Sequence, residues 1–256
     1  MNLHMWRSIV TTAAFCLASL TQASAAEIKV LTAGAYKQVI LTLVPDFEKQ
    51  TGHKVTVDNG TTGELKKRID GGEAFDVVVI TPAVTEEFIA SGKVAAGSKI
   101  TLASVGVGVM VKEGAPKPDV STVEAFKHAL LAAKTIAYID PASGGSSGIY
   151  VDNLLEKLGI ADQIRPKAKL KKGGYVADFI SSGEAELGIH QISEIVPAKG
   201  VTLVGPLPKE IQNTTVYAGG VSASSQNKVG AVALIKALSG SAAAAVLKSK
   251  GMDPAS

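Results

Sequence analysis

Residues 27–81 alternate between strand and helix patterns, and this alternation constrains the fold more than any other feature of the sequence. Residues 27–32 and 54–58 have the pattern of strands, and residues 75–81 form an almost continuous apolar run. Apolar residues at helical spacing lie between these runs. A continuous apolar run is typical of a parallel strand that is covered on both faces. The β-α-β-α-β order therefore predicts an α/β fold.

Small and polar residues lie where each predicted strand gives way to a helix. Residues 33–36 form the first such turn, and residues 59–63 form the second. Ligands of open α/β sheets bind at the carboxyl ends of the strands. The two turns therefore supply five candidate ligand-binding residues: Gly34, Ala35, Tyr36, Thr61 and Thr62. A compact surface turn would explain residues 33–36 equally well.

Residues 137–158 repeat the arrangement with a longer loop. The predicted strand ends at Asp140, a seven-residue polar loop follows Pro141, and apolar residues then recur at helical spacing. Glycines let the backbone approach a ligand closely, and the free N–H groups of a helix start favour an anion. Gly145, Ser146 and Ser147 are therefore candidate ligand-binding residues. An ordinary loop with Ser147 as the helix cap has the same composition.

Other kinds of chemistry have weaker support. Residues 144–148 match the G-x-S-x-G pattern of a serine nucleophile elbow, with Asp178 and His190 downstream. That elbow turns sharply from strand to helix, whereas the strand predicted here ends earlier, at Asp140. The sequence contains no phosphate-binding or dinucleotide glycine motif, and its histidines lack the paired spacing of metal ligands. We therefore expect no cofactor and no metal site.

The N-terminus has the pattern of a secretory signal peptide. Residues 1–25 contain Arg7, an apolar run over residues 9–20, and a small-residue site at residues 23–25. The run is too short to span a membrane. Cys16, the single cysteine of the chain, lies within this segment, so the exported chain would have no disulfide and no thiol nucleophile. We expect export to the periplasm.

The charges of the chain are nearly balanced. There are 26 Lys and Arg against 23 Asp and Glu, and the predicted signal contains only Arg7 of these. Such a balance suits a small anionic ligand and is too weak for nucleic acid. We therefore expect a small-anion partner, no nucleic acid, and no stable membrane insertion once the signal is removed.

Together these motifs resemble a known family, the periplasmic solute-binding proteins of ABC transporters, and within it the molybdate-binding branch. The segments that carry the resemblance are residues 30–35, 60–69, 72–80, 140–141, 148–150, 155–159 and 186–190. It implies a two-lobed type II periplasmic-binding-protein fold, in which each lobe is a mostly parallel sheet flanked by helices and crossing hinge strands join the lobes. The expected crossings lie near residues 104–111 and 214–222. The expected limits are residues 26–105 and 217–256 for lobe 1 and residues 106–216 for lobe 2.

The resemblance also implies a function, which is the capture of a small anion for an ABC permease in the membrane. In molybdate binders the donors are a serine, a serine-rich turn, backbone N–H groups and a tyrosine. The matching positions here hold Ala35, the Thr61 turn, the serine loop near residue 146, and Gln191 beside His190. These differences suit a small carboxylate at least as well as molybdate. Candidate counter-charges for a carboxylate are Tyr36 and Lys37, or Arg68.

A second function stays open, because aconitate isomerase is similar to the same branch. That enzyme is periplasmic and interconverts trans- and cis-aconitate. Moving a proton along an allylic acid needs one base and donors that hold the enolate-like carboxylate. His190 would be the base if the chain is such an isomerase. A histidine that hydrogen-bonds within the fold would explain the residue without catalysis.

Overall fold

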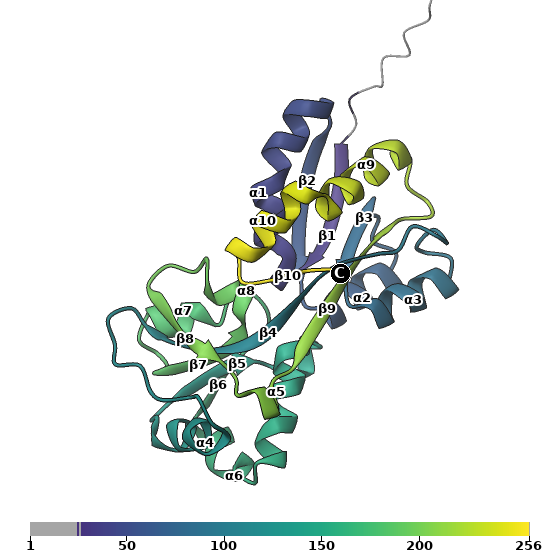
Figure 1. The fold of residues 1–256 in the computed structure, drawn as a ribbon. Coiled ribbons are helices and arrows are strands. Elements are labelled where there is room, and N and C mark those ends of the chain that lie inside the picture. Colours follow the sequence, from purple (N-terminus) through teal and green to yellow (C-terminus); the bar gives the residue numbers. More distant parts are fainter. Residues whose placement is uncertain (1–24, 26, 256) are drawn as a thin grey trace, which may run out of the picture.

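The computed structural model describes residue 25 and residues 27–255. The predicted signal peptide therefore lies outside the described residues, except for Ala25. The described chain is an α/β structure of two lobes that are stacked end to end (Figure 1). The fold predicted from the sequence is confirmed.

The first lobe is built from both ends of the described chain. It contains β1 (Glu27–Ala33), α1 (Gly34–Thr51), β2 (Lys54–Gly60), α2 (Thr62–Asp70), β3 (Val77–Ile80), α3 (Pro82–Ala90), β9 (Thr214–Val221), α9 (Lys228–Ser239), α10 (Ser241–Ser249) and β10 (Asp253–Pro254). Strand β1 pairs in parallel with β2 and β3, as the β-α-β-α-β pattern predicts. Because these strands are parallel, their carboxyl ends and the starts of α1, α2 and α3 share one edge of the sheet.

The second lobe is built from the middle of the chain. It contains α4 (Val123–Ala132), β5 (Ile136–Ile139), α5 (Ser146–Lys157), α6 (Ala161–Ile164), β6 (Ala168–Lys171), α7 (Ala177–Ser181), β7 (Leu187–Gln191), α8 (Ile192–Ile195) and β8 (Val201–Pro206). Short 3₁₀ turns lie at Pro141–Ser143, Arg165–Lys167 and Lys209–Ile211. Strand β5 pairs in parallel with β6 and β7. The second lobe thus repeats the parallel arrangement of the first.

Strand β4 (Ile100–Lys112) passes from one lobe to the other beside β9 (Figure 1). Its residues 100–106 pair antiparallel with β9, and its residues 107–112 pair with β7 and β8. The strand order is β2-β1-β3-β9-β4-β7-β5-β6, with β8 and β10 also paired to β4. The two crossings predicted from the sequence are therefore β4 and β9.

Each lobe has its own hydrophobic core. Val105 on β4 belongs to a cluster with Tyr36 and Tyr217, in the first lobe. Two positions further along the strand, Val107 belongs to a cluster with Tyr138, in the second lobe. The core thus changes from one lobe to the other within β4, and the exact lobe limits stay a prediction.

Several predicted boundaries were wrong by a few residues. Helix α5 begins at Ser146, because a 3₁₀ turn capped by Asp140 already reverses the chain and shortens the predicted polar loop. Helix α1 begins at Gly34 rather than at Tyr36. A capping-box pattern, with Glu124 three residues after Ser121, predicts Ser121 as the cap of the next helix, but α4 is capped by Thr122, whose hydroxyl accepts from the Ala125 N–H. Local capping contacts decide these ends, and apolar spacing alone does not reveal them.

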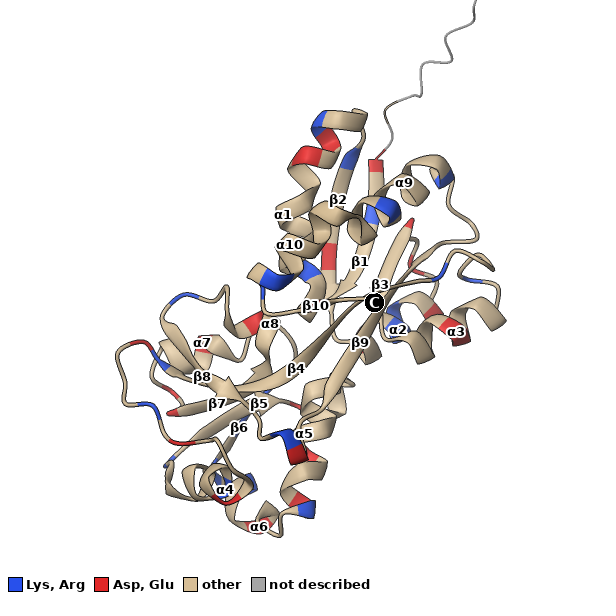
Figure 2. Cartoon of the chain, viewed as in Figure 1, with Lys and Arg blue, Asp and Glu red and all other residues tan. Residues whose placement is uncertain are grey.

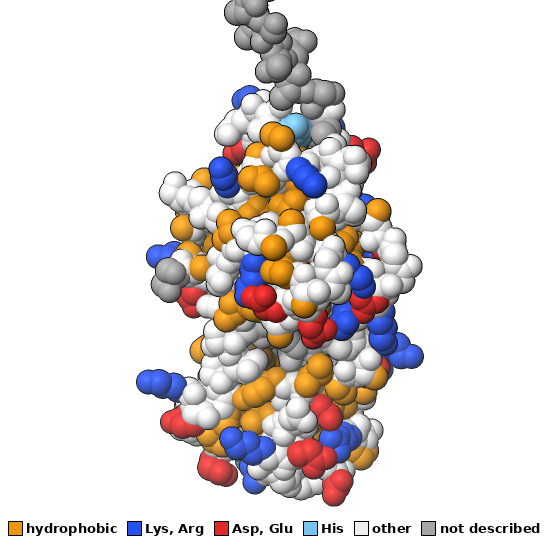
Figure 3. Space-filling model, turned by 90° about the vertical axis from the view of Figure 1, so that its right-hand side faces the viewer, with side chains coloured by type: hydrophobic (Ala, Val, Ile, Leu, Met, Phe, Trp, Pro, Cys, Tyr) orange, Lys and Arg blue, Asp and Glu red, His pale blue; other side chains and the backbone are white. Residues whose placement is uncertain are grey.

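Charged side chains are distributed over both lobes and are nearly absent from the crossing strands (Figure 2). On the face shown in Figure 3, acidic and basic side chains alternate with apolar ones. Among the described residues, no single helix is long and apolar enough to cross a membrane, although α9 and α10 pass that test as a pair bent by 59°. Both helices contribute apolar residues to the core of the first lobe, including Leu234 and Leu247.

Candidate ligand-binding site

A small cavity lies between the lobes, at the edge where the parallel strands end. Its volume is about 40 Å³, which exceeds the roughly 10–15 Å³ that a cavity needs to admit a single water molecule. The lining residues come from both lobes: Ala33, Gly34, Ala35, Asn59, Gly60, Thr61, Thr62 and Tyr217 from the first, and Ile139, Gly145, Ser146, Ser147, Gly174, His190, Gln191 and Glu194 from the second. The cavity is therefore of a size for a small polar ligand.

The first lobe brings two helix N-termini to the cavity. Helix α2 starts directly after Thr61, whose hydroxyl oxygen accepts from the Glu64 N–H at 3.1 Å. Helix α1 starts at Gly34, and its N-cap residue, Ala33, has no side chain that could cap it. The first N–H groups of a helix lack partners within the helix and carry partial positive charge. Both helix starts therefore suit an anionic ligand.

The second lobe brings a third N-terminus, that of α5. Its N-cap is Gly145, which makes no side-chain cap, and Ser146 and Ser147 are its first residues. Glycine is required at position 148, because a Cβ there would lie 2.2 Å from the carbonyl oxygen of Ile139. The helix can start this close to the end of β5 only without that side chain. The serine-rich loop thus places a helix start at the cavity, as the sequence indicated.

The lobes are in contact beside the cavity, so the structure is a closed form. The Gly63 N–H donates to the carbonyl oxygen of Gly144 at 3.2 Å, and the Thr61 hydroxyl donates to the carbonyl oxygen of Ser143. A Cβ on Gly63 would lie 2.7 Å from the Cα of Gly144. Position 63 therefore has no room for a side chain while the lobes are closed.

The end of β7 and the start of α8 form the most buried wall. His190 Nδ1 lies 3.4 Å from a carboxyl oxygen of Glu194, and the two side chains are only 2% and 8% exposed. Burial lowers the pKa of His190 to about 3 and raises the pKa of Glu194 to about 8. Near neutral pH the pair is therefore an uncharged imidazole beside a largely protonated carboxyl group.

Gln191 connects the end of β7 to the start of α5 and to the crossing strand β9 at this wall. Its amide nitrogen donates to Ser146 Oγ at 3.2 Å and to Thr215 Oγ1 at 3.0 Å. Within the described residues, Gln191 Oε1 and His190 Nδ1 are buried and have no hydrogen-bond partner. Buried polar atoms without a partner are costly. Gln191 Oε1 can only accept a hydrogen bond, so a ligand group that donates one would be favoured beside it.

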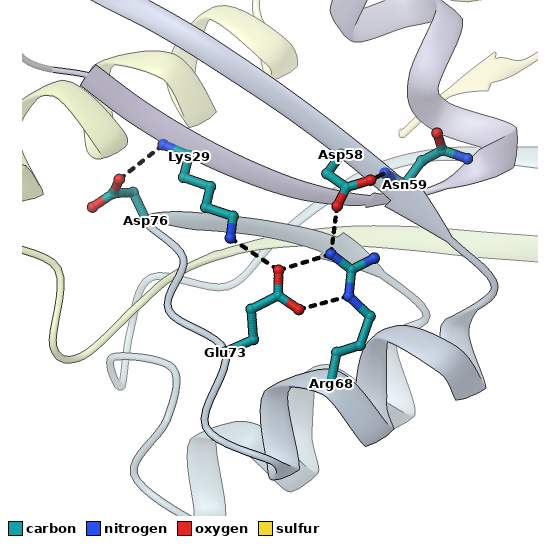
Figure 4. A network of polar contacts seen from close by, with 6 residues as sticks. All are labelled: Lys29, Asp58, Asn59, Arg68, Glu73 and Asp76. Carbon is teal, nitrogen blue, oxygen red and sulfur yellow. Dashed lines mark hydrogen bonds and ion pairs between the residues drawn. The ribbon is translucent and has the colours of Figure 1, made fainter.

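No lysine or arginine is among the described residues that line the cavity. Lys37 does not line the cavity, but its ammonium group donates at 2.7 Å to Oδ1 of Asn59, which does. Arg68 is held elsewhere, between Glu73 and Asp58 (Figure 4). This contact lowers the pKa of Glu73 to about 2. Arg68 therefore does not line the cavity as a counter-charge, because its Nε and Nη2 atoms are already paired with Glu73 and Asp58.

The structure brings nine of the ten predicted site residues to the cavity. Tyr36 does not join them. Its ring is fully buried in the core of the first lobe, and its hydroxyl donates to the Leu238 carbonyl at 3.1 Å. Tyr36 lies within α1 at helical spacing from the buried Val39 and Ile40, so it shares the face of the helix that packs in the core.

Sequence reasoning missed several lining residues, of which Asn59, Glu194 and Tyr217 carry polar side chains. Asn59 is the first residue of the predicted turn at residues 59–63 and could have been named with its other residues. Glu194 lies four residues after His190, and this spacing was the only sequence feature that could have indicated a place for it in the site. Tyr217 comes from the crossing strand β9, and nothing in its local sequence indicates a ligand site. Among the described residues, no group of three or more His, Cys, Asp or Glu could hold a metal ion.

Comparison with known proteins defines the class of protein. Residues 28–253 match the family described as bacterial extracellular solute-binding protein, and the chain belongs to this family. It is 32% identical to an aconitate isomerase of Pseudomonas sp. over 231 residues, which cover 88% of this chain and 87% of that protein. It is also 30% identical to the molybdate-binding protein ModA of Azotobacter vinelandii over 269 residues, with 98% of each chain covered.

Solved structures agree on the fold. The periplasmic molybdate-binding protein of Azotobacter vinelandii aligns with a TM-score of 0.73 at 22% identity, covering 88% of this chain and 98% of that one. The sulfate-binding protein SubI of Mycobacterium tuberculosis aligns with a TM-score of 0.71 at 17% identity, covering 90% and 87%. These structures show the fold, and the identity to ModA confirms the resemblance to the molybdate-binding branch that was inferred from the sequence.

Proposed function

We propose that this protein captures a small anion, an oxyanion such as molybdate or a small carboxylate, and delivers it to an ABC permease. The observation that carries the proposal is the convergence of three helix N-termini, those of α1, α2 and α5, on one cavity. Helix starts and hydroxyl groups can bind an anion without any cationic side chain. Membership of the solute-binding family and the similarity to ModA support this function, whereas the similarity to an aconitate isomerase supports the second candidate function below.

In this mechanism the dipoles of the protein replace the hydration of the anion. The ligand would first meet the N-terminus of one helix in an open form, and closure would then add the donors of the other lobe. The contacts of Thr61 and Gly63 with residues 143 and 144 hold the closed form. Because closure excludes water, each remaining dipole interacts more strongly with the anion. The proposed lobes are residues 26–105 with 217–256, and residues 106–216, and the proposed location is the periplasm.

Isothermal titration calorimetry of the chain without residues 1–25 tests this function. The ligands are sodium molybdate, sulfate, phosphate and trans-aconitate. We expect one anion to bind with 1:1 stoichiometry and a Kd in the micromolar range or below. A variant with Ser146→Ala and Ser147→Ala should bind at least tenfold more weakly, while Ser121→Ala on the exposed surface should not. If none of these anions binds, the proposal fails.

The second candidate function is an aconitate isomerase that uses the same cavity. The specific observation in its favour is the buried His190 and Glu194 pair, which could accept and return a proton. The base would take a proton from the methylene carbon, the double bond would shift by one carbon, and the proton would return to the former alkene carbon. The product has the same connectivity as the substrate, because the methylene and alkene carbons exchange places, and it differs in the geometry of the new double bond, which is cis.

Proton NMR of trans-aconitate with the purified protein separates the two functions. Appearance of cis-aconitate, absent from a protein-free control, would establish the isomerase. His190→Gln should then abolish turnover while trans-aconitate still binds. For a binding protein, the spectrum should stay constant, and His190→Gln should leave anion affinity nearly unchanged.

A further inference from the structure

Glu194 is unexpected at this site, because it is the one acidic side chain among the described residues that line the cavity. Its side chain is 8% exposed and lies 3.4 Å from His190 Nδ1. Its other carboxyl oxygen lies against Gly34, since a Cβ there would be 2.6 Å from that oxygen. The carboxyl group therefore lies over the start of α1. The N-terminus of α1 therefore faces the carboxyl group of Glu194 as well as any ligand in the cavity.

An ionised Glu194 and an anion would share a cavity of about 40 Å³. No lysine or arginine of the described residues lines this cavity to offset two negative charges. At such short distances and with water excluded, like charges repel strongly. Two acidic groups held this close keep one proton between them, as paired carboxylates do. The same limit applies to a carboxyl group and a bound anion.

We infer that Glu194 makes this cavity a proton-requiring anion site, in which the closed complex holds one proton between the Glu194 carboxyl group and the ligand. An anion that carries its own acidic proton, such as hydrogen phosphate, meets the requirement by donating a hydrogen bond to Glu194. A proton-free anion, such as sulfate or molybdate, binds only while Glu194 itself is protonated. The inference rests on the proposed function and names what the site requires of its ligand.

The other titratable side chains that face Glu194 do not hold the shared proton instead of Glu194. They are His190 on β7, Tyr217 on β9, and Tyr175 in the segment before α7. Burial lowers the pKa of His190, and it raises the pKa of both tyrosines above the usual range for this residue. Asp178 and Lys199 line an adjacent pocket on the outer side of Glu194. Glu194 is therefore the titrating group that an anion in the cavity would meet directly.

The test compares proton-free and protonated anions across pH. The affinity of the wild-type protein for sulfate, molybdate, trans-aconitate and hydrogen phosphate is measured by calorimetry between about pH 7 and about pH 9.5. We expect the affinity for any proton-free anion that binds to fall about tenfold per pH unit above about pH 8, the pKa of Glu194. Hydrogen phosphate, which keeps a proton over this range, should not show that loss.

Two further measurements keep the test decisive. Glu194→Gln is nearly isosteric and should bind proton-free anions with pH-independent affinity, whereas Glu113→Gln on an exposed loop should behave as the wild type does. Titration of the wild type in two buffers of different ionisation enthalpy should show about one proton taken up per proton-free anion above about pH 8. This second measurement needs no variant and holds even if Glu194→Gln fails to fold.

The outcomes separate the inference from the function on which it rests. Tight binding of sulfate, molybdate or trans-aconitate that is flat across pH, with no proton uptake, would overturn the role of Glu194 and leave the anion-binding function intact. Failure of every anion to bind at every pH would overturn the proposed function, and the inference with it. Loss of affinity with rising pH in the wild type, but not in Glu194→Gln, would support both.

Discussion

Closure of the lobes can be tested at a single glycine, Gly63, the second residue of α2. We expect Gly63→Ala to weaken anion binding without destabilising the protein. In the closed form the new Cβ would lie 2.7 Å from the Cα of Gly144 and 3.1 Å from the carbonyl oxygen of Ser143. Both neighbours are backbone atoms, so they cannot rotate away as a flexible side chain would. The lobes must separate to admit the methyl group.

The magnitude follows from the contacts that separation breaks. These are the hydrogen bond from the Gly63 N–H to Gly144 and the one from the Thr61 hydroxyl to Ser143. Each hydrogen bond contributes a net of about 0.5–1.5 kcal/mol, so the closed form should lose about 1–3 kcal/mol. Since about 1.4 kcal/mol is a factor of ten in affinity, Kd should rise by about 5- to 150-fold. Stability of the free protein should stay equal or rise by up to about 1 kcal/mol, because alanine favours a helix more than glycine does.

Calorimetry with the best-binding anion measures the affinity, and thermal unfolding without ligand measures the stability. Gly71→Ala, at the opposite end of the same helix, is the matched control, since a Cβ there would meet only carbonyl groups of its own helix at 3.3 Å. The control should bind as the wild type does. If Gly63→Ala also bound with wild-type affinity, the closed contacts between α2 and residues 143–144 would not contribute to ligand capture.

Three further predictions follow from the site and its supports. Ser146→Ala removes a hydroxyl group that accepts a hydrogen bond from Gln191 at 3.2 Å. We expect this variant to bind the anion about tenfold more weakly in calorimetry. Unchanged affinity would show that this hydroxyl faces away from the ligand. Arg68→Met removes the ion pairs with Glu73 and Asp58. It should lower the free energy of unfolding by about 1 kcal/mol and leave the Kd of the anion unchanged. A large change in Kd would show that Arg68 acts on the ligand. The pKa of Glu73 is lowered in the folded state to about 2 from 4.5, so its stabilising contribution is present above about pH 4.5 and is lost as pH falls toward 2. Acid unfolding of Glu73→Gln should therefore be less steep over this window than that of the wild type, and identical profiles would contradict the assignment.

Turn chemistry explains why most of the candidate site could be predicted from the sequence. Five of the site residues lie where a strand gives way to a helix, and such junctions share one edge of a parallel sheet; they are Thr61, Thr62, Gly145, Ser146 and Ser147. Their position in the cavity thus follows from local pattern and general topology. The parallel strands and the crossing strand β4 were predictable for the same reason, because apolar runs and long alternation mark them directly.

The remaining site residues depend on packing that no local pattern encodes. Tyr36 was expected at the cavity, but it lies on the buried face of α1, where its hydroxyl reaches Leu238, 202 positions away along the chain. Tyr217 reaches the cavity from β9, whose neighbours β3 and β4 are distant in sequence. Glu194 reaches it because α8 turns directly after β7. A shift of one residue in the pairing of β4 and β7 would turn His190 away from the cavity.

The placement of Glu194 sets one condition that applies to both candidate functions. A site made only of helix starts and hydroxyl groups would hold any anion of the right size. A buried carboxyl group at the start of α1 adds a condition, because the anion and the carboxyl group cannot both lose their protons in a closed, water-poor cavity. In a binding protein this condition selects among anions by the protons they carry. In an isomerase the same shared proton would lie beside the substrate, where proton transfer takes place. The protonation state of Glu194 in the ligand complex therefore matters to the binding function and to the isomerase function alike.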